Sequence, residues 1–197
     1  MAIVHTGLVT ESDGHELDEY LDRVLIGGRE EREVTIVDYD PSWVERFTEE
    51  RSRIQRALGP SARSVEHIGS TAVPGLAAKP IVDIIVSVDD PNDERTYRTQ
   101  LEEAGYVLRV REPDHRMFRT PERDVHIHIW RSGSDDERRH LIFRDWLRSH
   151  PADRADYERT KRMLAGNWPD MNYYANAKSE VINQIMDTAT RNRSRTT

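Results

Sequence analysis

The stretch from Pro80 to Val88, "PIVDIIVSV", constrains the fold most strongly, because one carboxylate, Asp83, interrupts a run of apolar and mostly β-branched residues. A near-continuous apolar run of this kind is typical of a central strand that is covered on both faces. An unpaired buried carboxylate is costly, so Asp83 must be neutralised, hydrogen-bonded or bound to a ligand. This strand therefore predicts both the centre of a sheet and a site of chemistry.

The stretch "DVHIHIW", Asp124 to Trp130, offers partners for that carboxylate. Side chains alternate between the faces of a strand, so His126 and His128 share one face, with Cα atoms roughly 6.5 Å apart. If this strand pairs beside the Asp83 strand, the three side chains converge. One carboxylate and two imidazoles suit Mn, Fe or Zn better than Mg alone. The alternative is that both histidines lie on a partly solvated face and Asp83 accepts backbone or arginine hydrogen bonds.

The rest of the pattern predicts an α+β fold, in which a mixed sheet is followed by a helical half. Further strands are expected at 33–39, 63–68, 106–110 and 116–120. Helices are expected at 40–59, 92–105, 134–149, 151–165 and 173–190. We expect one domain over 34–190, an extension over 1–33 that is partly disordered or holds one short helix, and a disordered tail over 191–197.

Composition narrows the classes of function. The chain has no cysteine, which excludes disulfides, thiolate metal sites and cysteine nucleophiles. The net charge of −7 argues against a nucleic-acid partner, which usually requires a basic surface. The sequence shows neither a run of about 20 apolar residues nor the features of a secretory signal, so we expect no membrane partner and a cytoplasmic location. The oligomeric state is left open.

The turn Gly69-Ser70-Thr71 lies between the strand at 63–68 and the Asp83 strand. Glycine allows close backbone approach, and the hydroxyl and amide groups that follow can bind phosphate. The alternative is a tight strand-to-helix turn without a ligand.

The spacing from Gly69-Ser70 to Asp83 is similar to the signature of the nucleotidyltransferase superfamily. More narrowly, the chain resembles the GrpB family from about Val34 to Met186. The resemblance is carried by "DYDPSWVERF", "VEHIGSTAVPGLAAKPIVDI", "HRMFR", "HIHIW", "RRHLIFRDWLRSHP" and "NYYANAKSEVI". It implies a nucleotidyltransferase-like sheet with a C-terminal helical region.

The resemblance also implies roles for individual residues. Gly69, Ser70 and Thr71 would bind nucleotide phosphates, and Asp83 would bind a divalent metal such as Mg or Mn. His126 and His128 would complete the metal shell or act as a base. Three further residues are candidates for binding the nucleotide and neutralising its phosphate charge: Arg144, Tyr174 and Lys178.

One position departs from the superfamily pattern. Active nucleotidyltransferases carry a second carboxylate two residues after the first, and this chain has Ile85 there. The leading hypothesis is a metal-dependent transfer of a nucleoside monophosphate from a nucleoside triphosphate (NTP) to a small acceptor. Ile85 favours the alternative of a non-catalytic nucleotide- or coenzyme-binding module. A mononuclear Asp/His/His metal enzyme is the third hypothesis, so catalysis itself stays open.

Overall fold

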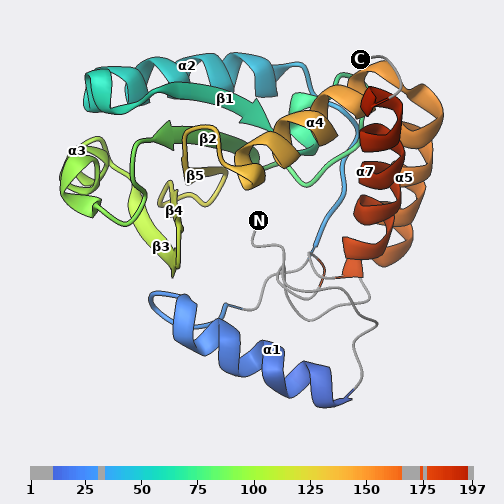
Figure 1. Ribbon diagram of the computed structural model, residues 1–197, viewed down its shortest axis with the longest axis horizontal. Helices are drawn as coiled ribbons and strands as arrows, with labels where there is room; N and C mark the ends of the chain where they lie inside the picture. Colours follow the sequence, from blue (N-terminus) through green and yellow to red (C-terminus); the bar gives the residue numbers. More distant parts are fainter. Residues whose placement is uncertain (1–10, 31–33, 166–173, 175–176, 195–197) are drawn as a thin grey trace.

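The computed structural model describes residues 11–30, 34–165, 174 and 177–194 (Figure 1). A five-stranded mixed sheet has the order β1-β2-β5-β4-β3. Its strands are β1 (Ser64–Ile68), β2 (Val82–Val88), β3 (Val107–Glu112), β4 (His115–Arg119) and β5 (Val125–Arg131). The central pair, β2 and β5, is parallel, and the other pairs are antiparallel. The predicted α+β class with a mixed sheet is confirmed.

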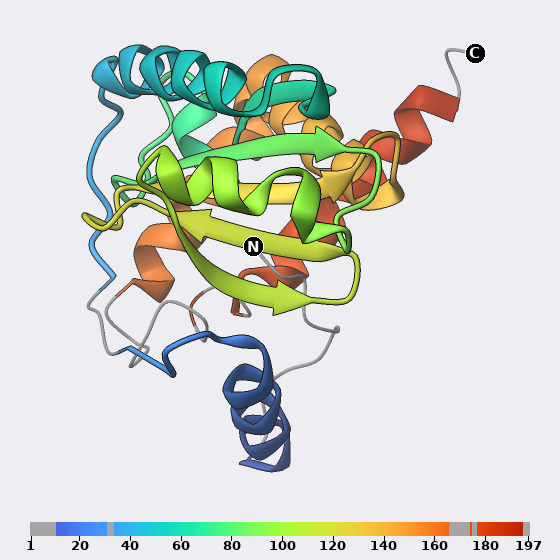
Figure 2. The ribbon, with the colours of Figure 1, turned by 90° about the vertical axis from the view of Figure 1, so that its left-hand side faces the viewer.

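Helices cover both faces of this sheet. They are α1 (Glu11–Val24), α2 (Ser42–Leu58), α3 (Arg98–Glu103), α4 (Asp135–Ser149), α5 (Pro151–Leu164) and α7 (Ser179–Ser194), with short 3-10 turns η1 (Gly59–Ser61), η2 (Ser70–Ala72) and η3 (Glu94–Thr96). In Figure 2, α2 and α3 lie on one side of the sheet and the C-terminal helices on the other. None of the described helices is both long and apolar enough to cross a bilayer.

The alternation of side chains along β2 and β5 divides the protein into two layers. Ile84 and Ile127 point to the α2 side, where they are fully buried in the main core with Ile54 of α2. Asp83, His126 and His128 point to the other side, toward α4 and the C-terminal helices. The main core therefore holds the sheet against α2 on one face. On the other face, the polar side chains point toward the C-terminal helices, where a ligand-binding site can form.

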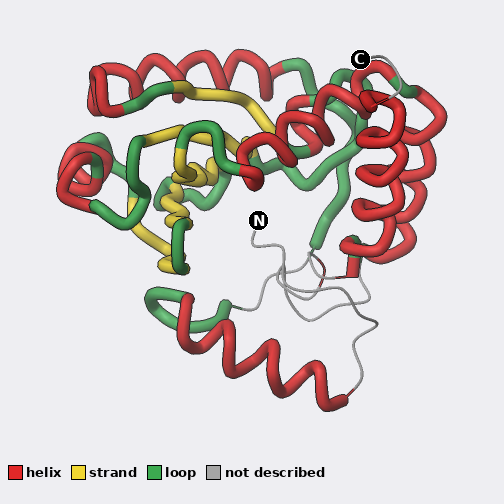
Figure 3. The backbone as a smooth tube through the Cα atoms, viewed as in Figure 1, coloured by secondary structure: helices red, strands yellow, loops and turns green. Residues whose placement is uncertain are grey.

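The strand predicted at 33–39 is wrong. Val37 makes a single antiparallel bridge, with reciprocal N–H to O bonds of 2.9 Å to Ala78, and the segment from 34 to 41 runs as a loop (Figure 3). The pairing cannot extend, because Pro80 has no N–H to donate on one side. On the other side, the N–H of Leu76 already donates to Val73 in a turn.

Several helix boundaries also differ from the predicted ones. The segment predicted as one helix at 92–105 is divided into η3 and α3, with Tyr97 between them in an extended φ of −148°. Helix α7 begins at Ser179 and continues to Ser194, into the segment predicted to be a disordered tail. Residues 173, 175, 176 and 195–197 lie outside the described residues, as does the start of the predicted N-terminal extension, 1–10.

The position of α2 generates the first prediction. Replacing the fully buried Ile54 with alanine should lower the free energy of unfolding by about 2–5 kcal/mol, because it leaves a cavity between α2 and the sheet. Val44→Ala on the same helix, at a side chain 47% exposed, should change it by less than about 0.5 kcal/mol. Chemical denaturation measures both, and equal effects would contradict the packing described.

Candidate metal centre

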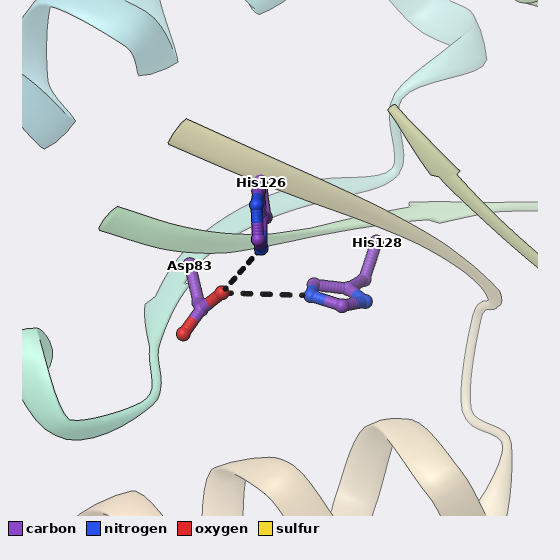
Figure 4. Close-up of side chains that lie close together, drawn as sticks. All are labelled: Asp83, His126 and His128. Carbon is purple, nitrogen blue, oxygen red and sulfur yellow. Dashed lines mark ion pairs between the residues drawn. The ribbon is translucent and has the colours of Figure 1, made fainter. Parts of the chain in front are cut away.

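Asp83, His126 and His128 converge because β2 and β5 pair in parallel, with Asp83 opposite His126 and Ile85 opposite His128. Asp83 Oδ1 lies 3.5 Å from His126 Nδ1 and 3.7 Å from His128 Nε2. Figure 4 shows both imidazoles directed at this one carboxylate oxygen. The three ligand atoms lie within 4.8 Å of one another, so the predicted convergence is confirmed.

These separations fit a shared metal ion. Nitrogen–oxygen distances of 3.5 and 3.7 Å are long for hydrogen bonds, which average about 2.9–3.0 Å. Two ligands each about 2.1 Å from a tetrahedral ion lie about 3.4 Å from each other, close to what the site shows. The ion-pair partners of Asp83 within the described residues are these two imidazoles and not an arginine. A carboxylate with two imidazoles is a donor set for Mn, Fe or Zn.

The protonation states also suit a metal ligand set. Burial alone would raise the pKa of Asp83, but the adjacent His126 and His128 lower it well below its usual range, so the carboxylate is ionised. Burial lowers the pKa of both histidines, so the imidazoles are neutral. An ionised carboxylate and neutral imidazoles are the forms that bind metal.

A second layer of hydrogen bonds orients His128. His115 Nε2 lies 3.1 Å from His128 Nδ1, and His115 Nδ1 lies 2.5 Å from Glu112 Oε2. All three side chains are buried, and Trp130 stacks on His115 with ring centroids 4.2 Å apart. Because His115 engages Nδ1 of His128, the Nε2 atom faces Asp83. Such outer partners fix the tautomer and orientation of a metal-binding histidine.

The Gly69-Ser70 turn lies against the carboxylate. Gly69 has a φ of +69°, and a Cβ atom added there would lie 2.6 Å from Asp83 Oδ2. Ser70 Oγ accepts a hydrogen bond of 3.0 Å from Lys161 Nζ. The Thr71 hydroxyl is instead engaged within the fold, since it donates to Ile81 O at 3.2 Å and contacts His67 Nε2 at 3.0 Å.

A cavity of about 200 Å³ opens beside these residues. Its wall includes Lys161 and Lys178, which are only 2% and 5% exposed. Two buried polar atoms of its lining residues, Tyr174 Oη and His140 Nε2, have no hydrogen-bond partner within the part of the chain that the structure describes. Buried polar groups are normally paired, so these atoms favour a polar ligand in the cavity.

The candidates for phosphate binding fall into two groups. Tyr174 and Lys178 line the cavity, with Lys178 Nζ 4.5 Å from the centre of the Tyr174 ring. Arg144 does not line it. Its guanidinium donates to Glu66 Oε2 at 2.8 Å and to the carbonyl of His67 at 3.0 Å. These two hydrogen bonds connect α4 to β1.

Four residues that line the cavity were not predicted from the sequence: Lys161, Tyr157, Glu112 and His115. A signal for the first two was present, because "YERTK" at 157–161 repeats the tyrosine-x-x-x-lysine spacing of "YANAK" at 174–178. Lys161 Nζ lies 4.9 Å from the centre of the Tyr157 ring, and Lys178 Nζ lies 4.5 Å from the centre of the Tyr174 ring. Glu112 and His115 carry no such signal, because their role depends on the turn that joins β3 to β4.

The family model described as GrpB protein matches residues 33–188. This chain belongs to the GrpB family. A UPF0157 protein of Streptomyces coelicolor is 50% identical over 182 residues, which cover 92% of this chain and 97% of the relative. A UPF0157 protein of Halalkalibacterium halodurans is 46% identical over 178 residues, which cover 87% and 91%. The crystal structure of the conserved protein GrpB from Enterococcus faecalis matches with a TM-score of 0.71 and 34% identity, over 81% of this GrpB chain and 99% of that one.

The contact between Gly69 and Asp83 generates a prediction with a matched control. Gly69→Ala should weaken Mn binding about tenfold or more, because its Cβ would displace the Asp83 carboxylate. Gly75→Ala carries the same strain of a positive φ, at +76°, but meets nothing within 4 Å. Calorimetric titration of Mn into both variants measures the difference. Equal Mn affinity in the two would contradict a metal site at Asp83.

The buried Lys161 predicts a pH dependence of stability. Burial lowers its pKa from 10.5 to about 7, so between these pH values the unfolded chain holds a proton that the folded chain lacks. The contribution of Lys161 to the free energy of unfolding therefore rises with pH between about 7 and 10.5. Relative to Lys161→Met, the wild type should gain about 2 kcal/mol in unfolding free energy between pH 7 and 9.

Denaturant unfolding of both proteins at the two pH values measures this gain, and titrations common to both cancel in the difference. Arg159→Met, at an exposed position of the same helix, should show no such change. A difference between wild type and Lys161→Met that is independent of pH would show that Lys161 remains charged in the fold.

Proposed function

We propose that this GrpB protein is a divalent-metal-dependent nucleotidyltransferase, which moves a nucleoside monophosphate from an NTP to a small acceptor. The observation that carries the proposal is the convergence of Asp83, His126 and His128 directly against the Gly69-Ser70 turn. A nucleotide phosphate needs a cation and hydrogen-bond donors close to each other. The three metal-centre residues would supply the first, and the hydroxyl and amide groups of the turn would supply the second.

Each group has a definite part in this proposal. Asp83, His126 and His128 would hold the ion, which would neutralise charge on the phosphate oxygens. Ser70, in the turn that lies against Asp83, would position the nucleotide phosphates. The buried Lys161 and Lys178 would lie beside the reacting α-phosphate. An acceptor oxygen forms a bond to the α-phosphorus, the bond from that phosphorus to the α,β-bridging oxygen breaks, and pyrophosphate leaves. Positioning and charge neutralisation supply most of the catalysis in such transfers.

A second candidate function is a nucleotide-binding module without turnover. Ile85 favours it, because this residue occupies the position of a second carboxylate and is fully buried with Ile68 and Trp130. Only one metal-binding carboxylate then remains on β2, whereas a two-metal clamp needs more acidic ligands. Product formation separates this candidate from the first.

The proposal predicts that NTP binding requires both the metal and Asp83. Calorimetric titration of each of the four NTPs, with Mn or Mg, should show binding to the wild type that Asp83→Ala weakens about 100-fold or more. Asp89→Ala, at an exposed carboxylate just beyond the end of β2, should leave binding unchanged. Metal-independent binding that survives Asp83→Ala would favour the module, and absence of NTP binding to the wild type would refute both.

A further inference from the structure

Helix α1 lies outside the part of the chain that the family model matches, yet it forms one wall of the cavity. The match begins at residue 33, and α1 ends at Val24. Leu17, Leu21 and Val24 are only 5%, 5% and 6% exposed and line the cavity. Their spacing places them on one face of the helix. In Figure 1 and Figure 2, α1 lies at the edge of the molecule nearest β3.

Backbone contacts fix α1 in this position. The segment after the helix pairs with β3 through a bridge between Leu25 and Val110, and the N–H of Ile26 donates to Arg109 O at 2.9 Å. The Arg109 guanidinium donates to the carbonyls of Ile26 and Gly28. The segment that follows α1 is therefore joined to the edge of the sheet at β3, which holds the helix beside the cavity.

A polar chain connects α1 to the metal centre. The Tyr20 hydroxyl donates to Glu112 Oε1, and the other oxygen of Glu112 holds His115. His115 in turn contacts His128, one of the three metal-centre residues. The position of the apolar wall is thus set relative to Asp83 through consecutive side-chain contacts.

The lining of the cavity differs from one edge of the sheet to the other. At the β3 edge, Leu17, Leu21 and Val24 of α1 line the cavity together with Val110 of β3 and Met117 of β4. At the β1 edge, Ser70, Lys161 and Lys178 add hydroxyl and ammonium groups to apolar side chains such as Ile182 and Met186. A wholly polar ligand would leave the apolar side chains of α1 without a matching group. A wholly apolar ligand would leave the Tyr174 hydroxyl without a partner among the described residues. It would also place no anion beside Lys161, whose hydrogen bonds are to the neutral oxygens Ser70 Oγ and Ala77 O.

We propose that α1 determines the substrate class, and that the cavity takes a small anionic amphiphile. Its phosphate group lies beside Lys161 and Lys178, and its aliphatic group of several carbons lies against Leu17 and Leu21. Resting on the proposed function, this ligand is the acceptor, and its phosphate oxygen is the atom that attacks the α-phosphorus of the NTP, so that Lys161 and Lys178 lie beside both reacting groups. The binding preference itself can be measured without nucleotide, so the two proposals fail separately.

The test uses inorganic phosphate and ethyl, butyl and hexyl phosphate, titrated by calorimetry into the full chain in the presence of Mn. Binding to the wild type should tighten with chain length, by up to about fourfold for each buried methylene. The double variant Leu17→Ala/Leu21→Ala should bind inorganic phosphate as the wild type does but lose most of the chain-length dependence. Ile26→Ala is the matched control, because this side chain is 40% exposed and does not line the cavity.

Three outcomes would overturn the inference. Affinity that is independent of chain length in the wild type would show that the α1 side chains only fill the space. Chain-length dependence retained in the double variant would place the apolar group elsewhere. Absence of binding by all four phosphates would refute the anionic end. If instead the alkyl phosphates bind as expected but no NTP binds with metal, the ligand class stands and the nucleotidyltransferase proposal fails.

Discussion

The parallel pairing of β2 with β5 is the constraint on which the rest of the structure depends. It places Asp83 opposite His126 and Ile85 opposite His128. Side chains on the same face of the two strands therefore meet, and Asp83, His126 and His128 form one cluster of possible ligands. A shift by one residue would turn the histidines of β5 into the main core. That core prevents the shift, since Ile84 and Ile127 are fully buried behind the cluster against α2 and could not exchange faces with charged or polar side chains.

The polar face of the sheet is stabilised by ordered layers of contacts. Asp83 is ionised beside two neutral imidazoles, and His128 is held by His115, which is held by Glu112. The partly buried carboxylate of β2 is therefore compensated on the face that opens to the cavity, while the opposite faces of β2 and β5 present Ile84 and Ile127 to the main core. The same arrangement leaves Tyr174 Oη and His140 Nε2 without partners among the described residues, in two side chains that line the cavity.

Much of the fold and of the metal centre could be predicted from the sequence, because strand alternation is a local property. The apolar run around Asp83 and the alternation at His126 and His128 each identify a buried strand without knowledge of its neighbours. The strand expected at 33–39 failed for a reason outside that segment, since its partner segment contains Pro80. The resemblance to the GrpB family predicted Arg144 at the phosphates, but the structure places its guanidinium on Glu66 of β1 instead.

Local pattern in the sequence was enough to place one carboxylate on a central strand and two histidines on a shared strand face. It also determined GrpB membership, through motifs spread over most of the chain. The residues that line the cavity beside that carboxylate followed only from the packing of the whole chain: Lys161 from α5, Glu112 from β3 and the apolar side chains from α1. These residues are distant in sequence, and their meeting depends on strand register and helix packing. Strand register and helix packing both depend on the burial of the whole core, so they cannot be predicted from a short stretch of residues.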